Sequence, residues 1–458
     1  MRQKLLTALS ILACGTSAYL NAETLTGTWS GKLDLGGLSL GLVMHISDTN
    51  GENGLPAVTL DSPDQGAKGI PVHTDFYSPD SIAVSMPQMA LSYSGKLEAD
   101  TLKGTFTQMG NSLPLKMTRG ESVRLRPQTP KPPFPYTNEE VTITVEDGDY
   151  TLAGTLTLPE GANADTPVVV MVTGSGLQDR DETLFGHKPF AVLADRLARA
   201  GIGSLRYDER GVPPSTGEVK GVTTIDFAYD TNQVMMWALK RGFKNVGILG
   251  HSEGGLIGFM LSNYAGFIVT MGAPAIPGCE IMLDQLDGKL AEMGLNKDER
   301  ERAGKVLVDV FKAITTRDLS ITDKALEAMV RKRMGESMNQ WSSPKFKEWE
   351  TLEAMRGDLS FILDPWMLEF LCSWPAEYIE DGSCPALALY GEKDTQVRAE
   401  PNAASIRKYN PIVKVKVYEG LNHLMQPCRT GKATEYAEIE TTIDEAVITD
   451  IIAFIKSL

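Results

Sequence analysis

Short runs in which apolar and polar residues alternate fill the first quarter of the chain; three of them span residues 38–46, 82–86 and 102–108. A period of two predicts β-strands with one buried face. Turn signals such as Asn50-Gly51 and Asn53-Gly54 separate the runs. The pattern predicts a small all-β domain, a barrel or a sandwich, over residues 23–126.

A proline-rich segment follows this region and contains Pro127, Pro130 and Pro132-Pro133. Proline restricts the backbone and removes a hydrogen-bond donor, so such a segment is stiff and extended. We therefore expect a linker over residues 127–136 and a second domain over residues 137–458.

The pattern changes in the second domain. After a predicted hairpin around residues 146–149, short apolar runs alternate with helical segments; the runs are 168–172, 202–207, 246–249, 267–271 and 386–390. This alternation predicts an α/β domain with a largely parallel, doubly wound sheet.

Charged, amphipathic segments interrupt this rhythm at about residues 277–376 and predict a helical cap inserted over the sheet. The cap has methionines and tryptophans that either pack its helices or line a substrate pocket, and packing is the favoured interpretation. They are Met293, Met329, Met334, Met338, Met355, Trp341, Trp349 and Trp366.

Composition is that of a globular protein: 42% of the 458 residues are hydrophobic and the formal net charge is −15. An acidic surface argues against nucleic acid and anionic membranes as partners. No metal-binding or cofactor motif is present, so we expect neither a metal nor a cofactor. Four cysteines remain beyond the first segment, either as disulfides or as free thiols: Cys279, Cys372, Cys384 and Cys428.

The first 22 residues have the pattern of a signal peptide. Arg2 and Lys4 precede an apolar run, and small residues follow it, with cleavage expected after Ala18 or Ala22. The protein is thus expected to be exported, periplasmic or extracellular, with no transmembrane segment. A lipid anchor on Cys14 is the less favoured alternative.

Gly250-His251-Ser252-Glu253-Gly254 directly follows the apolar run 246–249. A serine between glycines, after a strand and before a helix, is typical of a nucleophile elbow. Gly37 to Gly41 has the same G-x-S-x-G spacing, but Ser39 lies in an alternating run with no helix after it. We interpret Ser39 as structural and Ser252 as the nucleophile.

The base must come from the five histidines of the chain. His45 and His73 lie in the β domain, His187 precedes the serine, and His251 is inside the elbow, with its side chain expected to point away from the serine. In hydrolases of this type the chain order is serine, acid, histidine. Only His423 follows Ser252, so it is the predicted base.

The acid should follow a strand and come before the histidine. Asp394 directly follows the run 386–390, and Glu392 is the near alternative. For the oxyanion hole, we expect the Glu253 N–H and a second N–H from Ser175 or Gly176, in the loop after residues 168–172. The charged stretches 179–182 and 208–211 are interpreted as an Arg–carboxylate scaffold rather than a substrate anchor.

With these motifs, and with 186–190 and 422–424, the chain resembles the α/β-hydrolase superfamily and its exported bacterial EstD-type esterases, over about residues 140–458. The resemblance implies a carboxylesterase that forms an acyl-enzyme on a small-molecule ester through Ser252, His423 and Asp394. Leu177 and the stretch 212–215 depart from the expected pattern. A serine amidase or peptidase is the alternative, and a binding protein on an inactive hydrolase fold is a further one.

Overall fold

We describe the protein from a computed structural model, which covers residues 25–34, 39–51, 54–63, 67–108, 110–120, 126–146, 148–292, 294–301, 304, 308 and 364–458. The chain divides into two compact units, Met1–Val123 and Arg124–Leu458. The predicted signal peptide and Cys14 lie outside the described residues. No helix of the described ranges is long and apolar enough to cross a membrane.

The first unit contains a closed barrel of eight antiparallel strands in sequence order. These are β1 (Gly27–Asp34), β2 (Ser39–Asn50), β3 (Pro56–Ser62), β4 (Ala67–Ser78), β5 (Ser81–Met86), β6 (Leu91–Glu98), β7 (Thr101–Gln108) and β8 (Asn111–Arg119). A short 3-10 helix, η3 (Pro87–Met89), precedes β6. The barrel closes where Trp29 of β1 pairs with Arg119 of β8, and alternate residues such as Trp29, Met44 and Tyr93 fill its interior. The predicted all-β fold is thus confirmed as a barrel.

The proline-rich segment packs against the second unit. Arg126 donates hydrogen bonds to the carbonyl oxygens of Phe185, Ala437 and Ile439, at 2.7, 3.0 and 3.1 Å. Gln128 Oε1 accepts from the amide of Thr442 at 2.6 Å, and its Nε2 donates to the carbonyl of Ile443 at 2.7 Å. Although its sequence predicts a linker, this segment is therefore anchored at residues 126 and 128.

An eight-stranded sheet forms the centre of the second unit, in the order β16-β15-β14-β13-β11-β12-β10-β9. The strands are β9 (Tyr136–Thr144), β10 (Thr151–Pro159), β11 (Val168–Val172), β12 (Gly203–Tyr207), β13 (Val246–His251), β14 (Ile268–Met271), β15 (Ala386–Gly391) and β16 (Lys414–Tyr418). The hairpin β9–β10 is antiparallel, and its strand β10 pairs with β12 in antiparallel orientation. The strands β11 to β16 are parallel to one another.

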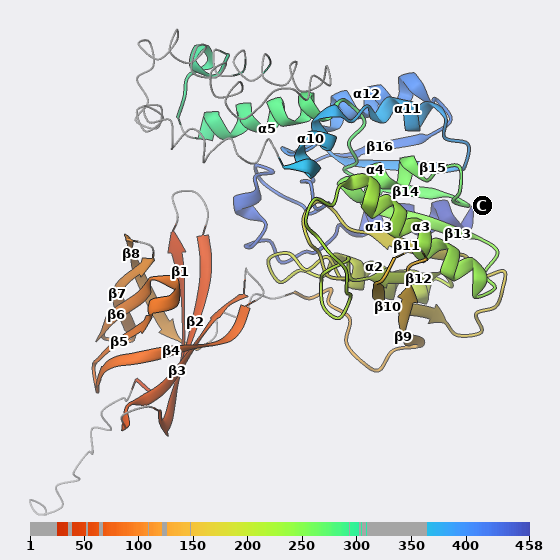
Figure 1. The fold of residues 1–458 in the computed structure, drawn as a ribbon. Coiled ribbons are helices and arrows are strands. Elements are labelled where there is room, and N and C mark those ends of the chain that lie inside the picture. The colour runs from red at the N-terminus through yellow and green to blue at the C-terminus, as the bar shows by residue number, and fades with distance from the viewer. Residues whose placement is uncertain are drawn as a thin grey trace, which may run out of the picture. The chain divides into compact units, whose positions relative to one another are not determined.

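Helices cover both faces of this sheet (Figure 1). One face packs against α2 (Pro189–Arg199) and α13 (Glu445–Lys456). The other packs against α3 (Thr224–Lys240), α4 (Glu253–Met260), α11 (Pro375–Glu380) and α12 (Ala399–Tyr409). Successive residues of β11 enter the two cores in turn: Val168, Val170 and Val172 on one side, Val169 and Met171 on the other. Burial on both faces explains why the run is apolar throughout. The predicted α/β-hydrolase fold is confirmed.

The insertion between β14 and β15 contains the helices α5 (Gly278–Glu292) and α10 (Pro365–Cys372), which pack on each other. Of the eight predicted cap methionines and tryptophans, Trp366 alone falls within the described residues, and the other seven lie outside them. The four cysteines form no disulfide with one another: Cys279, Cys372, Cys384 and Cys428.

Candidate active site

The elbow lies between β13 and α4. Ser252 has φ 51° and ψ −119° and is the N-cap residue of α4. A positive φ is unfavourable for a residue with a Cβ, at a cost of roughly 1–3 kcal/mol. The turn holds this conformation partly through the Ser252 amide, which donates to the carbonyl of Met271 at 2.8 Å.

The two flanking glycines are required by close packing. A Cβ on Gly250 would lie 2.0 Å from the carbonyl oxygen of Gly254, and one on Gly254 would lie 2.1 Å from that of Val172. No side chain fits at either position. The close approach of α4 to Gly250, and of the end of β11 to Gly254, therefore explains the G-x-S-x-G spacing here.

The same spacing at Gly37 to Gly41 has a different setting. Ser39 is the first residue of β2, opposite Asp34 of β1, and the strand continues to Asn50. No helix begins there, so this second match has no elbow.

The structure brings His423 and Asp394 together behind the elbow. His423 Nδ1 lies 2.6 Å from Asp394 Oδ2, and both residues are buried. Asp394 Oδ1 accepts from the amides of Gln396 and Val397, each at 2.8 Å. Because both carboxylate oxygens are engaged, the aspartate is fixed in position and fixes the imidazole.

Glu392, the alternative acid, does not reach the histidine. Its side chain is turned to the chain segment after β16, where Oε2 accepts from the amide of Gly420 at 3.0 Å.

The other histidines are engaged elsewhere. His187 is buried against Thr442 and the carbonyl of Tyr436. In the barrel, His45 Nε2 lies 3.0 Å from Asp61 Oδ2, and His73 Nδ1 lies 2.9 Å from Asp75 Oδ1. Both ring nitrogens of His251 face other groups, Glu182 Oε1 and the carbonyl of His423, and its ring lies against that of His423, with 4.7 Å between centroids.

Ser252 and His423 line one cavity of about 440 Å³. Within the described part of the chain, Ser252 Oγ and His423 Nε2 are not hydrogen-bonded to each other. Such bonds are often long in unliganded hydrolases and tighten when substrate binds.

Two backbone N–H groups are available for an oxyanion. Glu253 is the first residue of α4, where an amide has no partner within the helix and the helix dipole favours negative charge. On the opposite loop, the Gly174 amide donates to Glu182 Oε1 at 2.8 Å. Of the described lining residues of that loop, Ser175 therefore has the free amide; Gly176 is not among the residues that line the cavity.

The Glu253 side chain ties the elbow to the cap. Its Oε1 accepts from Thr224 Oγ1 of α3 at 2.5 Å and from Trp366 Nε1 of α10 at 2.7 Å. Burial raises the pKa of this carboxyl, and hydrogen bonds from the side chains of Thr224, Trp366 and Ser175 oppose that rise. Trp366 thus both lines the cavity and holds the cap helix to the elbow.

Apolar side chains form much of the cavity wall. They include Ile281, Met282, Trp366, Met367, Phe370, Val397 and Leu424. Trp366 and Phe370 are stacked, with ring centroids 5.7 Å apart. The sequence pattern left Trp366 open between helix packing and pocket lining, with packing favoured, and the structure shows it in both settings. The other lining residues were not predicted, because α5 and α10 come together only in the tertiary structure.

A buried glutamate supports the predicted oxyanion loop from behind. Glu209 Oε2 accepts from the Gln178 amide at 3.0 Å, and its Oε1 contacts Thr173 Oγ1. Burial, together with the nearby carboxylates of Glu253 and Glu182, raises the pKa of Glu209 to about 8.

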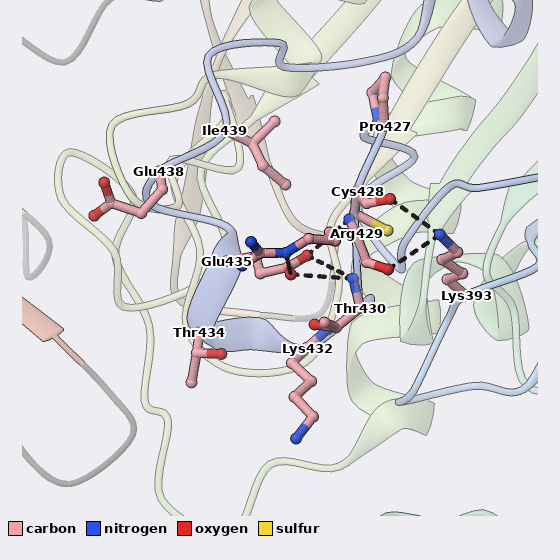
Figure 2. A pocket seen from close by; sticks show the side chains of 10 residues that line it. All are labelled: Lys393, Pro427, Cys428, Arg429, Thr430, Lys432, Thr434, Glu435, Glu438 and Ile439. Carbon is pink, nitrogen blue, oxygen red and sulfur yellow. Dashed lines mark hydrogen bonds and ion pairs between the residues drawn. The ribbon is translucent and has the colours of Figure 1, made fainter.

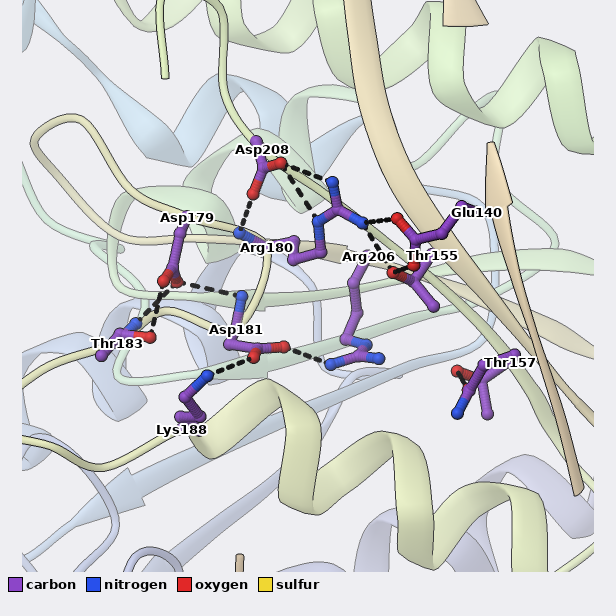
Figure 3. Close-up of polar contacts among 11 residues, drawn as sticks. Glu140, Thr155, Thr157, Asp179, Arg180, Asp181, Thr183, Lys188, Arg206 and Asp208 are labelled. Carbon is purple, nitrogen blue, oxygen red and sulfur yellow. Dashed lines mark hydrogen bonds and ion pairs between the residues drawn. The ribbon is translucent and has the colours of Figure 1, made fainter. Parts of the chain in front are cut away.

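The charged stretches form an ion-pair network at the edge of the site (Figure 3). Arg180 donates to Asp208 Oδ2 through Nη2 at 2.6 Å and through Nε at 3.1 Å, and to Glu140 through Nη1 at 2.6 Å. Arg206 pairs with Asp181. These ion pairs agree with the scaffold interpretation, because Arg180 and Arg206 are both paired with carboxylates of the protein itself. Glu182 lies outside this network, since its side chain lines the cavity that contains Ser252.

A second cavity, of about 840 Å³, is lined mainly by polar and charged residues (Figure 2). One of them is Lys393, which directly precedes Asp394 in the sequence. Lys393 Nζ donates there to the carbonyls of Cys428 and Arg429, at 3.3 and 3.1 Å. The lysine thereby holds the chain beyond His423 in place. Among the described residues, no group of three or more His, Cys, Asp or Glu side chains could hold a metal ion.

The chain has the α/β-hydrolase fold: a mostly parallel sheet, with a strained serine at the end of β13 and a buried imidazole–carboxylate pair. No family model matches the sequence. The chain is similar to esterase EstD of Thermotoga maritima, with 28% identity over 327 residues, which cover 69% of this chain and 67% of that protein. The resemblance to the superfamily and to its EstD-type esterases is confirmed.

Several solved structures are similar to this chain. One is the Pyrococcus furiosus esterase Pf2001, which is 16% identical, with a TM-score of 0.39; the match covers 70% of this chain and 93% of that one. Est1E of Butyrivibrio proteoclasticus with bound ferulic acid has 15% identity, a TM-score of 0.40 and coverage of 69% and 98%. A proline iminopeptidase of Mycobacterium smegmatis has 16% identity, a TM-score of 0.41 and coverage of 70% and 98%.

Proposed function

We propose that the protein is a serine carboxylesterase that works through an acyl-enzyme, with Ser252 as nucleophile, His423 as base and Asp394 as the orienting acid. The observation that supports this most is the buried 2.6 Å contact between His423 Nδ1 and Asp394 Oδ2, beside a serine in the elbow conformation. Similarity to an esterase over 69% of the chain supports the ester as the reacting group.

In the first half of the reaction, Ser252 Oγ attacks the ester carbonyl carbon while its proton passes to His423 Nε2. The carbonyl oxygen becomes an oxyanion, which accepts hydrogen bonds from the Glu253 and Ser175 amides. The tetrahedral intermediate collapses, and the alcohol leaves with the proton from His423. Asp394 stabilises the imidazolium that forms between these steps.

The second half repeats this chemistry with water. His423 takes a proton from a water molecule, the resulting hydroxide attacks the acyl-enzyme, and the carboxylic acid is released as Ser252 regains its proton. The only adjustment that the proposal requires is formation of the hydrogen bond between Ser252 Oγ and His423 Nε2.

The cavity suits an uncharged, apolar acyl group. Its described wall is mainly aliphatic and aromatic, and the carboxyl of Glu253 faces it from the elbow. An anionic acyl group would lose hydration beside this carboxyl without gaining a partner. We therefore propose neutral esters as the substrate class.

A panel of aryl esters with acyl chains of two to twelve carbons, assayed beside aminoacyl amides, tests the proposal. We expect ester turnover to dominate, and a dicarboxylic half-ester to react at least about tenfold more slowly than its neutral methyl ester analogue. Predominant turnover of the amides would instead identify an amidase or peptidase.

A further inference from the structure

A second imidazole–carboxylate pair lies against the first. Glu182 Oε1 is 2.7 Å from His251 Nδ1, and both side chains are buried, with exposed fractions of 1% and 5%. The pair has no place in the proposed reaction, since neither group is the nucleophile or the base. A buried charge is costly without a partner, so its presence beside the elbow needs a physical explanation.

The protonation of His251 follows from its neighbours. Glu182 Oε1 also accepts from the Gly174 amide at 2.8 Å, so this oxygen is an acceptor. His251 Nδ1 must therefore donate to it. The other ring nitrogen, Nε2, lies 3.1 Å from the carbonyl oxygen of His423, which can only accept. Because both nitrogens face acceptors, the ring carries two protons and a positive charge.

The charged groups around the ring agree with this state. Burial acts to lower the pKa of His251, but the charge and hydrogen bond of Glu182, the carbonyl of His423 and the charge of Asp394 raise it overall. The titratable ring of His423 lies against that of His251, with 4.7 Å between centroids.

The contacts of the pair connect three parts of the site. Glu182 holds the Gly174 amide, whose neighbour Ser175 has the proposed oxyanion donor. His251 precedes the nucleophile in the elbow and holds the backbone of the proposed base. A Cβ on Gly174 would lie 3.2 Å from that of Ser252, so the loop and the elbow are in close contact.

The backbone at Glu182 also indicates a constraint. Its φ is 53°, in the left-handed region that glycine favours, although its side chain is long. Strain of this kind persists where surrounding contacts determine the conformation. The two hydrogen bonds to Glu182 Oε1 are such contacts.

We propose that Glu182 and His251 are positioning residues, which form an ion pair that fixes the predicted oxyanion loop and the His423 backbone on either side of Ser252. The expected effect of this ion pair on the reaction rate rests on the proposed function, whereas the protonation of His251 does not depend on that function. The pair keeps the amide of Ser175 and the ring of His423 at the spacing that a tetrahedral intermediate needs.

The test uses the full chain with two substitutions. Glu182→Gln keeps an oxygen that can accept from Gly174 and His251 but removes the charge; Glu182→Ala removes the acceptor as well. We expect kcat to fall about tenfold in E182Q and about 100-fold in E182A, with KM changed less than about threefold. Partial rescue by the isosteric amide distinguishes positioning from a loss of stability.

Glu140→Gln is the matched control, because Glu140 pairs with Arg180 in the ion-pair network that does not include Glu182, and its side chain is 75% exposed. Its kcat should equal that of the unmodified protein. Each rate is divided by the concentration of sites that react with a fluorophosphonate, so that unfolded protein does not count. An unchanged kcat per site in E182A would overturn the proposal.

A second readout does not use activity. Nitrogen NMR of the five ring-labelled histidines, with His251 assigned through His251→Gln, should show one ring with two protonated nitrogens at pH 8, and this signature should be lost in E182A. A neutral His251 in the unmodified protein would overturn the inference. If no ester is hydrolysed but the signature is found, the proposed function fails and the ion pair stands.

Discussion

The barrel and the α/β unit contain the same chemical ingredients in different arrangements. Each has a G-x-S-x-G sequence and a histidine hydrogen-bonded to an aspartate: Ser39, His45 and Asp61 in the barrel, and Ser252, His423 and Asp394 in the α/β unit. What separates them is backbone geometry and the use of the second ring nitrogen.

In the barrel, His45 Nδ1 is engaged with Thr28 Oγ1 at 3.1 Å and Nε2 with Asp61, so neither ring nitrogen is left for a reacting group. Ser39 belongs to a continuous strand. In the α/β unit, His423 uses only Nδ1 for its aspartate, and its Nε2 has no hydrogen-bond partner among the described residues. Residue types and their spacing in the sequence are therefore insufficient to identify a catalytic site. A catalytic histidine also needs a free nitrogen, and a catalytic serine needs an exposed turn.

Of all the substitutions, replacement of the two serines should show the largest difference in activity between the two units. Ser252→Ala removes the proposed nucleophile, and we expect kcat/KM for an aryl ester to fall by roughly 10⁴–10⁶-fold. Ser39→Ala should leave the rate unchanged, because Ser39 lies in β2 of the barrel. Steady-state kinetics on both purified variants checks this, and a comparable loss in both would show that the barrel serine takes part.

The two aspartates should differ almost as much. Asp394→Asn leaves an amide that can favour the wrong imidazole tautomer, so we expect kcat to fall by about 10³–10⁴-fold. Asp61→Asn should not affect kcat. Glu392→Gln is the control within the same loop, because the Glu392 side chain accepts from the Gly420 amide and does not contact His423. A large loss in E392Q with little loss in D394N would reverse the assignment of the acid.

Buried acids of the two units should respond to pH in opposite directions. Glu209 has its pKa raised to about 8, chiefly by burial. The folded state thus holds a proton that the unfolded state releases above about pH 4.5, so this group lowers stability as pH rises from about 4.5 to about 8. Burial raises the pKa of Asp61, but the Gly69 amide and His45 lower it overall, so its stabilisation is lost as pH falls.

Glu209→Gln tests this difference. The amide oxygen can accept from the Gln178 amide, and its NH₂ group can donate to Thr173 Oγ1, whose hydroxyl donates to Glu209 in the parent protein. We expect urea unfolding of the α/β unit at pH 9 to show the variant more stable than the parent by on the order of 4 kcal/mol, with little difference at pH 5. A gap that does not grow with pH would mean that Glu209 is ionised throughout.

Trp366→Phe should have the smallest effect. Phenylalanine keeps the stacking on Phe370 but loses the hydrogen bond to Glu253. We expect KM to rise by up to about tenfold, with kcat changed less than about twofold. Trp374→Phe is the control, since Trp374 is 51% exposed and does not line the cavity. Equal effects of both substitutions on KM would argue against a role of the Glu253 contact in binding.

Much of the fold could be predicted because burial leaves a local signature. The strands β11 and β15 are buried on both faces and are uninterrupted apolar runs, and the hairpin β9–β10 has a turn signal between its two strands. Whether the first eight strands form a barrel or a sandwich depends on the pairing of β1 with β8. These two strands are about ninety residues apart, and no local sequence pattern encodes their pairing.

The site was predictable in part for the same reason. Ser252, Asp394 and His423 each follow a strand, so chain order and sheet topology indicate them. Glu182 was missed as a site residue because its charged surroundings, Asp179 to Asp181, indicate a solvated loop. Only the tertiary structure turns it inward to His251 while Asp181 pairs with Arg206.

Labelling with a fluorophosphonate, followed by mapping of the modified peptide by mass spectrometry, is the direct test of Ser252 as the nucleophile. We expect one phosphonylated residue per chain, at Ser252, with full labelling of Ser39→Ala and none of Ser252→Ala. A label on Ser39, or labelling that persists in Ser252→Ala, would contradict it.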